Sequence, residues 1–272
     1  MFPSSFDYVR ASSVSEAISI LNNEEDAKLI AGGHSLLPLM KLRLANPSKL
    51  VDIGRISDLS YIEDRGDHVA IGALTRHHAI ENSQVIKASV PMLSHVASLV
   101  GDPSVRHRGT LGGSVSHGDG ASDLPAAILA LDATLVITSG NGVREVEAKN
   151  FFKGFLETDL NQGEILTEIK VPKATGGWSY QKFNRRAQDW AIVGVAAVRN
   201  GSTKISLVNM ASMPIRAEAV ENALSGGASI DEAAALASEG IDPPSDLNAS
   251  ADYRRHLASV LVRRALAEAN SN

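Results

Sequence analysis

The chain has 272 residues, of which 44% are hydrophobic and 21% charged, a composition typical of a globular protein with two or three domains. Its net charge of −5, without any basic stripe, argues against a general nucleic-acid-binding protein. Cysteine is absent, which excludes a disulfide, a thiolate zinc site and a cysteine-ligated iron–sulfur cluster on this chain.

The first 55 or so residues predict a small lobe of short strands and helices. Ser13 and Glu16 have capping-box spacing, and the apolar residues that follow lie on one helical face. Two short apolar runs, 28–31 and 49–53, are typical of strands. The proline-containing segment 36–44 between them is expected to be coil or a helical turn.

A second lobe is predicted from about residue 57 to residue 175. Alternating or continuous apolar runs indicate its strands, and apolar residues at helical spacing indicate its helices. The predicted strands are 68–73, 133–138 and 164–171. Three helices are predicted: one that begins after Thr75 as its cap, one over 91–100 and one over 123–131.

A pair of glycines at 176–177 marks the start of a third region. Alternating apolar residues predict three antiparallel strands, and helical periodicity predicts three helices after them. The strands are 178–186, 191–199 and 204–210, and the helices are 214–225, 229–239 and 251–269. This order indicates an α+β protein with domains 1–56, 57–175 and 176–272, and it departs from a doubly wound dinucleotide fold.

Two glycine-rich segments are the most informative motifs. Ala-Gly-Gly-His-Ser stands at 31–35 and Thr-Leu-Gly-Gly-Ser at 110–114. Adjacent glycines let backbone N–H groups approach and surround phosphate oxygens. Neither segment fits the usual dinucleotide or P-loop pattern. Two such loops predict one long phosphate-bearing ligand between two lobes, although a pair of glycines can also mark a plain tight turn.

Residues 31–44 and 110–125 resemble the FAD-binding subunits of molybdenum hydroxylases, most of all the flavoprotein subunits of the aerobic carbon monoxide dehydrogenases. The similarity continues through Glu164–Leu166, Arg185–Ala191 and the C-terminal segment 246–254. This resemblance implies a two-lobed FAD-binding domain of the vanillyl-alcohol-oxidase type. A C-terminal domain with a three-stranded antiparallel sheet and helices would follow it.

This resemblance implies that the chain binds FAD. It implies no catalytic side chain and no metal ligand on this chain. The first segment supplies pyrophosphate donors, and the second supplies phosphate and ribose contacts. The residues implied are Leu29, Ile30, Ala31, Gly32, Gly33, His34, Ser35, Leu36, Thr110, Gly112, Gly113, Ser114, Asp123, Leu166 and Lys182.

Several of these residues have a simpler alternative role. Asp123, matched to a position that accepts from flavin or adenosine hydroxyls, can equally cap the helix it precedes. Leu166 can be an ordinary inward-facing strand residue, and Lys182 a solvated one. The histidines, including His34 and His107, have no spacing typical of a metal site.

The resemblance also implies partners: a small subunit with 2Fe–2S clusters and a large subunit with the molybdenum cofactor, together a heterotrimer. Electrons would pass from the clusters to FAD here and then to an external acceptor, with a quinone as one candidate. The lack of cysteine agrees with this division. The substrate would be carbon monoxide or, alternatively, a heterocycle such as nicotine or a purine.

Two other functions stay open at this point. One is a free-standing flavin oxidoreductase of the same fold, and the other is a non-enzymatic module that has lost the flavin. The N-terminal residues lack the pattern of a secretory signal, and no apolar run reaches the roughly 18 residues of a membrane span. We therefore expect a cytoplasmic protein, with membrane association only through its complex.

Overall fold

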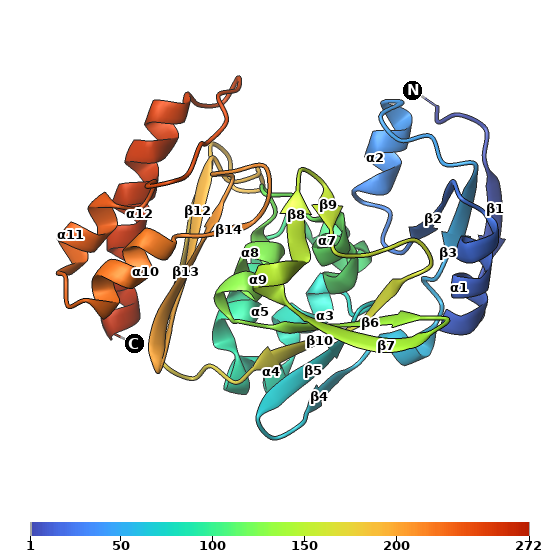
Figure 1. The fold of residues 1–272 in the computed structure, drawn as a ribbon, viewed down its shortest axis with the longest axis horizontal. Helices are drawn as coiled ribbons and strands as arrows, with labels where there is room; N and C mark the ends of the chain where they lie inside the picture. The colour runs from blue at the N-terminus through green and yellow to red at the C-terminus, as the bar shows by residue number, and fades with distance from the viewer. Residues whose placement is uncertain (1, 272) are drawn as a thin grey trace.

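The computed structural model describes residues 2–271, which form three regions side by side in chain order (Figure 1). The N-terminal region is a parallel three-stranded sheet of order β1-β3-β2. Its core forms where apolar residues of the first helix pack on the sheet. Its elements are β1 (Asp7–Arg10), α1 (Val14–Asn23), β2 (Ala27–Ile30), α2 (Leu36–Lys41) and β3 (Lys49–Asp52).

The start of α1 differs from the predicted capping box in one bond. The Ser13 hydroxyl accepts from the N–H of Glu16, as expected. The Glu16 carboxylate, however, accepts from the N–H and hydroxyl of Ser12 at 2.7 and 2.5 Å. In α2, Pro38 lies in the first turn, where the missing N–H costs no helical hydrogen bond, so the segment is helical.

The central region is a five-stranded sheet of order β4-β5-β10-β6-β7, antiparallel throughout, with helices packed against it. The predicted strands and the helices that begin at Pro91 and Asp123 are confirmed. Thr75, by contrast, is not a helix cap, because α3 begins after Arg76 and the Thr75 hydroxyl donates to the Tyr61 carbonyl.

The elements of the central region are η1 (Ser57–Leu59), β4 (Ile62–Asp64), β5 (His68–Gly72), α3 (His77–Asn82), α4 (Gln84–Ser89), α5 (Pro91–Ser98), α6 (Pro103–Arg108), α7 (Leu111–His117), α8 (Asp123–Ala130), β6 (Thr134–Ser139), β7 (Gly142–Glu147), α9 (Ala148–Phe151), β8 (Phe152–Gly154), β9 (Glu157–Thr158) and β10 (Ile165–Pro172).

The C-terminal region is an antiparallel sheet of order β11-β12-β13-β14 with three helices on one side. The three predicted strands are confirmed, and a two-residue strand, β14, joins them. Because β14 takes up residues 215–216, the helix predicted from 214 begins only at Glu218. The elements are β11 (Trp178–Phe183), β12 (Val193–Asn200), β13 (Ser202–Val208), β14 (Ile215–Arg216), α10 (Glu218–Ser225), α11 (Ile230–Ala235) and α12 (Ala251–Ser271).

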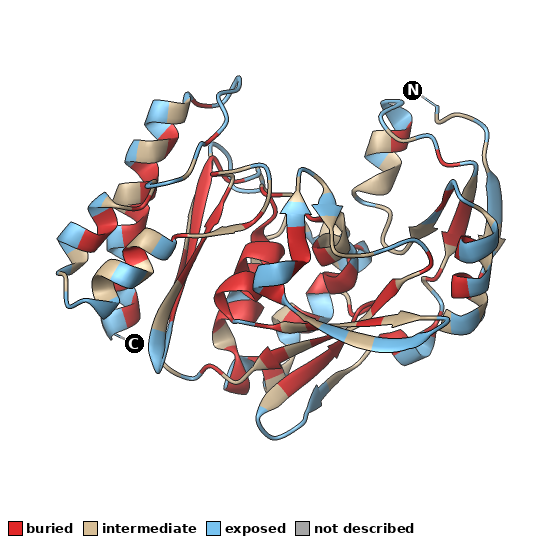
Figure 2. Ribbon diagram, viewed as in Figure 1, coloured by how far each residue is buried: buried red, intermediate tan, exposed pale blue. Residues whose placement is uncertain are grey.

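Strand β12 is buried on both faces, which explains its continuous apolar sequence (Figure 2). Val193, Val195 and Ala197 belong to the C-terminal core under α12. Ala196 and Val198 belong to the central core, against α8. The third region is thus packed on the second through a shared sheet. Among residues 2–271, no helix combines the length and the apolar character that crossing a membrane requires.

Candidate functional site

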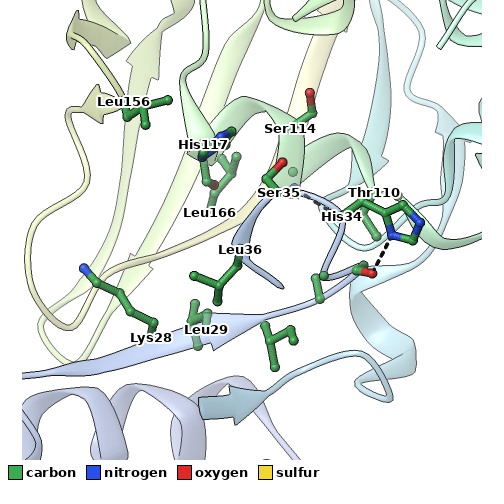
Figure 3. Close-up of a pocket in the computed structure, with 18 of the residues that line it drawn as sticks. Lys28, Leu29, His34, Ser35, Leu36, Thr110, Ser114, His117, Leu156 and Leu166 are labelled. Atoms are coloured by element: carbon green, nitrogen blue, oxygen red, sulfur yellow. Dashed lines mark hydrogen bonds between the residues drawn. The ribbon is translucent and has the colours of Figure 1, made fainter. Parts of the chain in front are cut away.

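A cavity of about 1070 Å³ lies between the N-terminal and central regions. Every residue that the sequence predicted for the cofactor site lines it. Figure 3 shows the two sides: Lys28 and Leu29 lie on β2, His34 and Ser35 lie on the loop after it, and Ser114 comes from α7 across the cavity. The tertiary structure therefore brings the two glycine segments together around one space.

The loop after β2 presents unused backbone donors to this cavity. Among the described residues, no acceptor is found for the N–H groups of Gly32, Gly33, His34 and Ser35. Gly33 has φ +76°, a left-handed conformation that glycine adopts without strain. His34 Nδ1 donates to the Gly32 carbonyl at 3.0 Å, which fixes the imidazole as part of the loop. Consecutive free N–H groups around such a turn form a concavity that binds anions.

The loop after β2 lies against residues 108–109, immediately before the second glycine segment, and this contact requires a glycine. A Cβ on Gly32 would lie 2.4 Å from the carbonyl oxygen of Arg108 and 2.9 Å from the Cα of Gly109. The ring of His77 supports the other side of Gly109, and the His77 N–H donates to the Gly109 carbonyl at 3.1 Å. A side chain at position 32 would push the lobes apart.

The second segment uses its N–H groups differently from the sequence-based prediction. Thr110 caps α7, and its hydroxyl accepts from the N–H of Gly113 at 3.1 Å. The N–H of Gly112 donates to the Ala73 carbonyl at 2.8 Å, and that of Ser114 to the Thr110 carbonyl at 3.0 Å. These backbone donors are already engaged within the protein. What this segment can offer a ligand is the Ser114 hydroxyl and the side-chain-free surface of Gly113.

Asp123 and Lys182 form a buried ion pair that the sequence did not reveal. Lys182 Nζ lies 2.8 Å from Asp123 Oδ2, and the two side chains are only 7% and 8% exposed. The Tyr180 hydroxyl donates to Asp123 Oδ1 at 2.5 Å, and Lys182 also donates to the Leu99 carbonyl at 3.0 Å. Ser122, not Asp123, is the N-cap of α8, so the capping alternative is wrong. The solvated alternative for Lys182 is wrong as well.

Burial dominates the electrostatics of this corner. It raises the pKa of the Asp123 carboxyl, while the Lys182 ammonium and the Tyr180 hydroxyl act in the opposite direction. Burial, together with the Asp123 carboxylate, also raises the pKa of the Tyr180 hydroxyl far above its ordinary range. Tyr180 therefore stays a hydrogen-bond donor to Asp123 throughout the physiological pH range.

His77 lines the cavity and was not predicted. It is only 4% exposed, and burial, reinforced by the charge of Arg76, lowers its pKa to about 4. His77 is therefore neutral at pH 7. Among residues 2–271 no group of three or more histidine and acidic side chains is placed to hold a metal ion.

Several other side chains near the cavity have defined roles. Arg106 pairs with Glu81 at 2.9 Å and donates to the carbonyls of Val100 and Gly101, so its guanidinium is committed to the protein. Leu166 packs in the central core, as an inward-facing strand residue would, and it also lines the cavity. Trp190 lines the cavity and is 59% exposed. The Arg-Arg-Ala-Gln-Asp-Trp-Ala run at 185–191 was the sequence signal that could have found it.

Comparison with known proteins identifies related chains. Residues 4–174 match the family described as the FAD binding domain in molybdopterin dehydrogenase, and residues 178–269 match the CO dehydrogenase flavoprotein C-terminal domain. The chain is 42% identical to the carbon monoxide dehydrogenase medium chain of Hydrogenophaga pseudoflava, over 98% of this chain and 97% of that protein. It is 39% identical to the glyceraldehyde dehydrogenase medium chain of Sulfolobus acidocaldarius, over 98% and 99%.

A solved structure shares the whole fold. In carbon monoxide dehydrogenase from Hydrogenophaga pseudoflava, one chain superposes with a TM-score of 0.95 at 43% identity. The similarity covers 100% of this chain and 99% of that one. The family matches and this superposition therefore extend over both glycine segments and the C-terminal region.

Proposed function

The chain belongs to the FAD-binding medium subunits of the molybdenum-containing oxidoreductases, and we propose that it transfers electrons within such an enzyme. It would accept electrons from iron–sulfur clusters on a small partner subunit and pass them to an external acceptor. The observation that carries this proposal is the loop 32–35, whose free N–H groups face a cavity that every predicted cofactor residue lines.

The groups that line the cavity fit the chemistry of FAD. The unpaired N–H groups of residues 32–35 suit the pyrophosphate, because they need an acceptor that the protein does not supply. The hydroxyls of Ser35 and Ser114 have no partner among residues 2–271 and can bond phosphate or ribose oxygens. Apolar side chains such as Leu166 can exclude water from the ring system.

Each element of the site then has a task in the proposal. Residues 29–36, with Gly113 and Ser114, hold the phosphates and ribose, and Thr110 fixes the helix behind them. Asp123 and Lys182 keep a neutral, rigid wall at the far end, where the carboxylate can accept from a cofactor hydroxyl. FAD, when bound, supplies the exchange between single-electron and two-electron transfer.

We also propose that 1–56, 57–175 and 176–272 are the domains of the chain. The first two contribute walls of the cavity, and most of the buried apolar residues of each form a separate cluster, with Leu59, Leu74 and Ile165 of the second joining the cluster of the first. The third packs its sheet on the second domain and sends the loop 184–191 to the cavity. A division at 175 falls between the two family matches, which end at 174 and begin at 178.

We propose that the partners are a small 2Fe–2S subunit and a large molybdenum-cofactor subunit, in a heterotrimer. The absence of cysteine from this chain requires that any iron–sulfur cluster be bound elsewhere. Carbon monoxide is the substrate we favour for the whole enzyme because of the similarity to the Hydrogenophaga chain. An aldehyde is the second candidate, because the glyceraldehyde dehydrogenase chain is nearly as similar. A quinone is the acceptor we propose to test first.

The test is to purify the chain together with whatever subunits copurify with it and to record the absorbance spectrum. Flavin bands with broad iron–sulfur absorbance, bleached by carbon monoxide or by glyceraldehyde, would support the proposal and identify the substrate. A flavin-containing chain that oxidises an organic substrate without partners would replace it with a free-standing oxidoreductase. A chain that stays colourless after FAD is added would refute the assignment of the cavity.

A further inference from the structure

In the part of the chain that the structure describes, the loop that carries Trp190 to the cavity is hydrogen-bonded to other segments only at its base. Residues 184–191 connect β11 to β12, and the Ile192 N–H closes the loop by donating to the Phe183 carbonyl at 2.7 Å. Among residues 2–271, the hydrogen bonds and ion pairs of residues 184–190 are local, such as the ion pair of Arg186 with Asp189 at 2.9 Å. Its position over the cavity must therefore be set by what holds the residues after Trp190.

Arg254 on α12 holds one of these residues. Its side chain is fully buried, and its guanidinium donates to the carbonyl of Ile192 and, at 3.2 Å, to that of Asn209. Its charge is balanced by Asp246 at 2.8 Å. A guanidinium is suited to this task because its fork of donors reaches several acceptors at fixed angles, which an ammonium cannot do.

Asn209 holds the other residue and links it to the second glycine segment. Its side-chain amide donates to the Ala191 carbonyl at 2.7 Å, and its backbone N–H donates to the Gly120 carbonyl at 2.7 Å. Gly120 lies between α7 and α8, the helices that carry Ser114 and Asp123. Asn209 adopts φ +60°, a left-handed conformation that asparagine tolerates better than most residues.

We infer that Arg254 and Asn209 are positioning residues, which hold the loop 184–191 in register with α7 and α8 and so set how Trp190 faces the cavity. Arg254 does not line the cavity and reaches the loop through the carbonyls of Ile192 and Asn209. The inference rests on the proposed function in one respect, that the occupant of the cavity is FAD. The placement of Trp190 itself does not depend on that occupant.

The experiment uses Trp190 as its own reporter. The chain has two tryptophans, so Trp178→Phe leaves Trp190 as the single emitter. In this background we would compare Asn209→Gly and Arg254→Lys. Asn209→Gly keeps the backbone bonds and the left-handed φ and removes only the amide donor. The matched control is Arg255→Lys, since Arg255 is the next residue of α12 and, within residues 2–271, pairs only with the exposed Asp242 and Asp252.

Without FAD, we expect both test variants to lower the fluorescence anisotropy of Trp190 and to raise its acrylamide quenching about twofold, with the control unchanged. With FAD, we expect about fivefold faster flavin release in the test variants. That acceleration should disappear when Trp190→Ala is added, because the loop then has no indole to place. Arg254→Lys is conservative because it keeps the charge opposite Asp246. Should Arg254→Lys fail to fold, Asn209→Gly alone decides whether the loop is held in place by these residues.

Unchanged anisotropy in Asn209→Gly would overturn the inference. So would equal acceleration of flavin release with and without Trp190, because it would show a general loosening of the fold. If the parent chain binds no FAD at all, the proposed function fails, and the flavin-free anisotropy still decides whether these residues position the loop.

Discussion

The buried pair of Asp123 and Lys182 leads to the sharpest prediction. Asp123→Asn keeps the shape of the side chain and removes its charge, which leaves the Lys182 ammonium only 7% exposed and without a counter-ion. Removing one partner of a buried ion pair typically destabilises a protein by about 3–5 kcal/mol. For a chain of this size, 1 kcal/mol shifts Tm by about 2–4 °C, so we expect Tm to fall by roughly 6–20 °C.

The double variant Asp123→Asn with Lys182→Met separates charge from shape. It removes both charges, so we expect it to be at least about 1 kcal/mol more stable than Asp123→Asn alone. The assay is urea unfolding of the flavin-free chain at pH 7, followed by circular dichroism. Flavin affinity is then measured separately by fluorescence titration, so that loss of the fold is not mistaken for loss of a ligand contact.

Asp64→Asn is the matched control. Asp64 pairs with Lys173 at 2.7 Å, but these side chains are 47% and 32% exposed. A surface pair of the same chemistry contributes at most about 1 kcal/mol. The same unfolding measurement on Lys182→Met alone completes the cycle. An Asp123→Asn cost no larger than that of Asp64→Asn would refute this prediction, as would a double-variant cost equal to the sum of the Asp123→Asn and Lys182→Met costs.

The remaining predictions concern the glycine loop and two titrating groups. Gly33→Val should abolish flavin binding with the fold kept, because φ is +76° and a Cβ would lie 2.9 Å from Leu37. The control is Gly201→Val, where φ is +77° and nothing lies within 4 Å of a Cβ; it should bind FAD normally in the same fluorescence titration. Because the pKa of His77 is lowered to about 4, the unfolded chain binds a proton that the native chain does not between about pH 6.5 and pH 4. The free energy of unfolding should therefore decrease by up to about 3 kcal/mol as the pH is lowered from 6.5 to 4. In urea unfolding, His77→Leu should show a smaller decrease over the same pH range. The hydrogen bond from Arg144 lowers the pKa of Glu164 to about 2, so its contribution is complete above about pH 4.5 and is lost as the pH falls towards 2. Glu164→Gln should therefore destabilise the chain at pH 7 and lose little further stability in acid; equal acid sensitivity of both proteins would contradict this.

The sequence by itself determined the elements and the two glycine segments, because the signals for both are local. Periodicity over a few residues sets which face of α1 or β10 is apolar, and adjacent glycines set where the backbone can turn left-handed, as at Gly33. The motifs also carried the family resemblance, which the family matches confirm. The residues predicted from the motifs and the resemblance all line one cavity in the structure.

Only the tertiary structure decided which polar groups are free and which are paired. The N–H of Gly112 donates to the Ala73 carbonyl, whereas the N–H groups of residues 32–35 have no acceptor among the described residues. Asp123 and Lys182 are 59 residues apart in the chain, and Arg254 reaches a carbonyl 62 residues away. Such partners are chosen when lobes and sheets pack, where an unpaired buried charge is too costly to persist. The local sequence does not predict that choice, because it is compatible both with a paired polar group and with a free one.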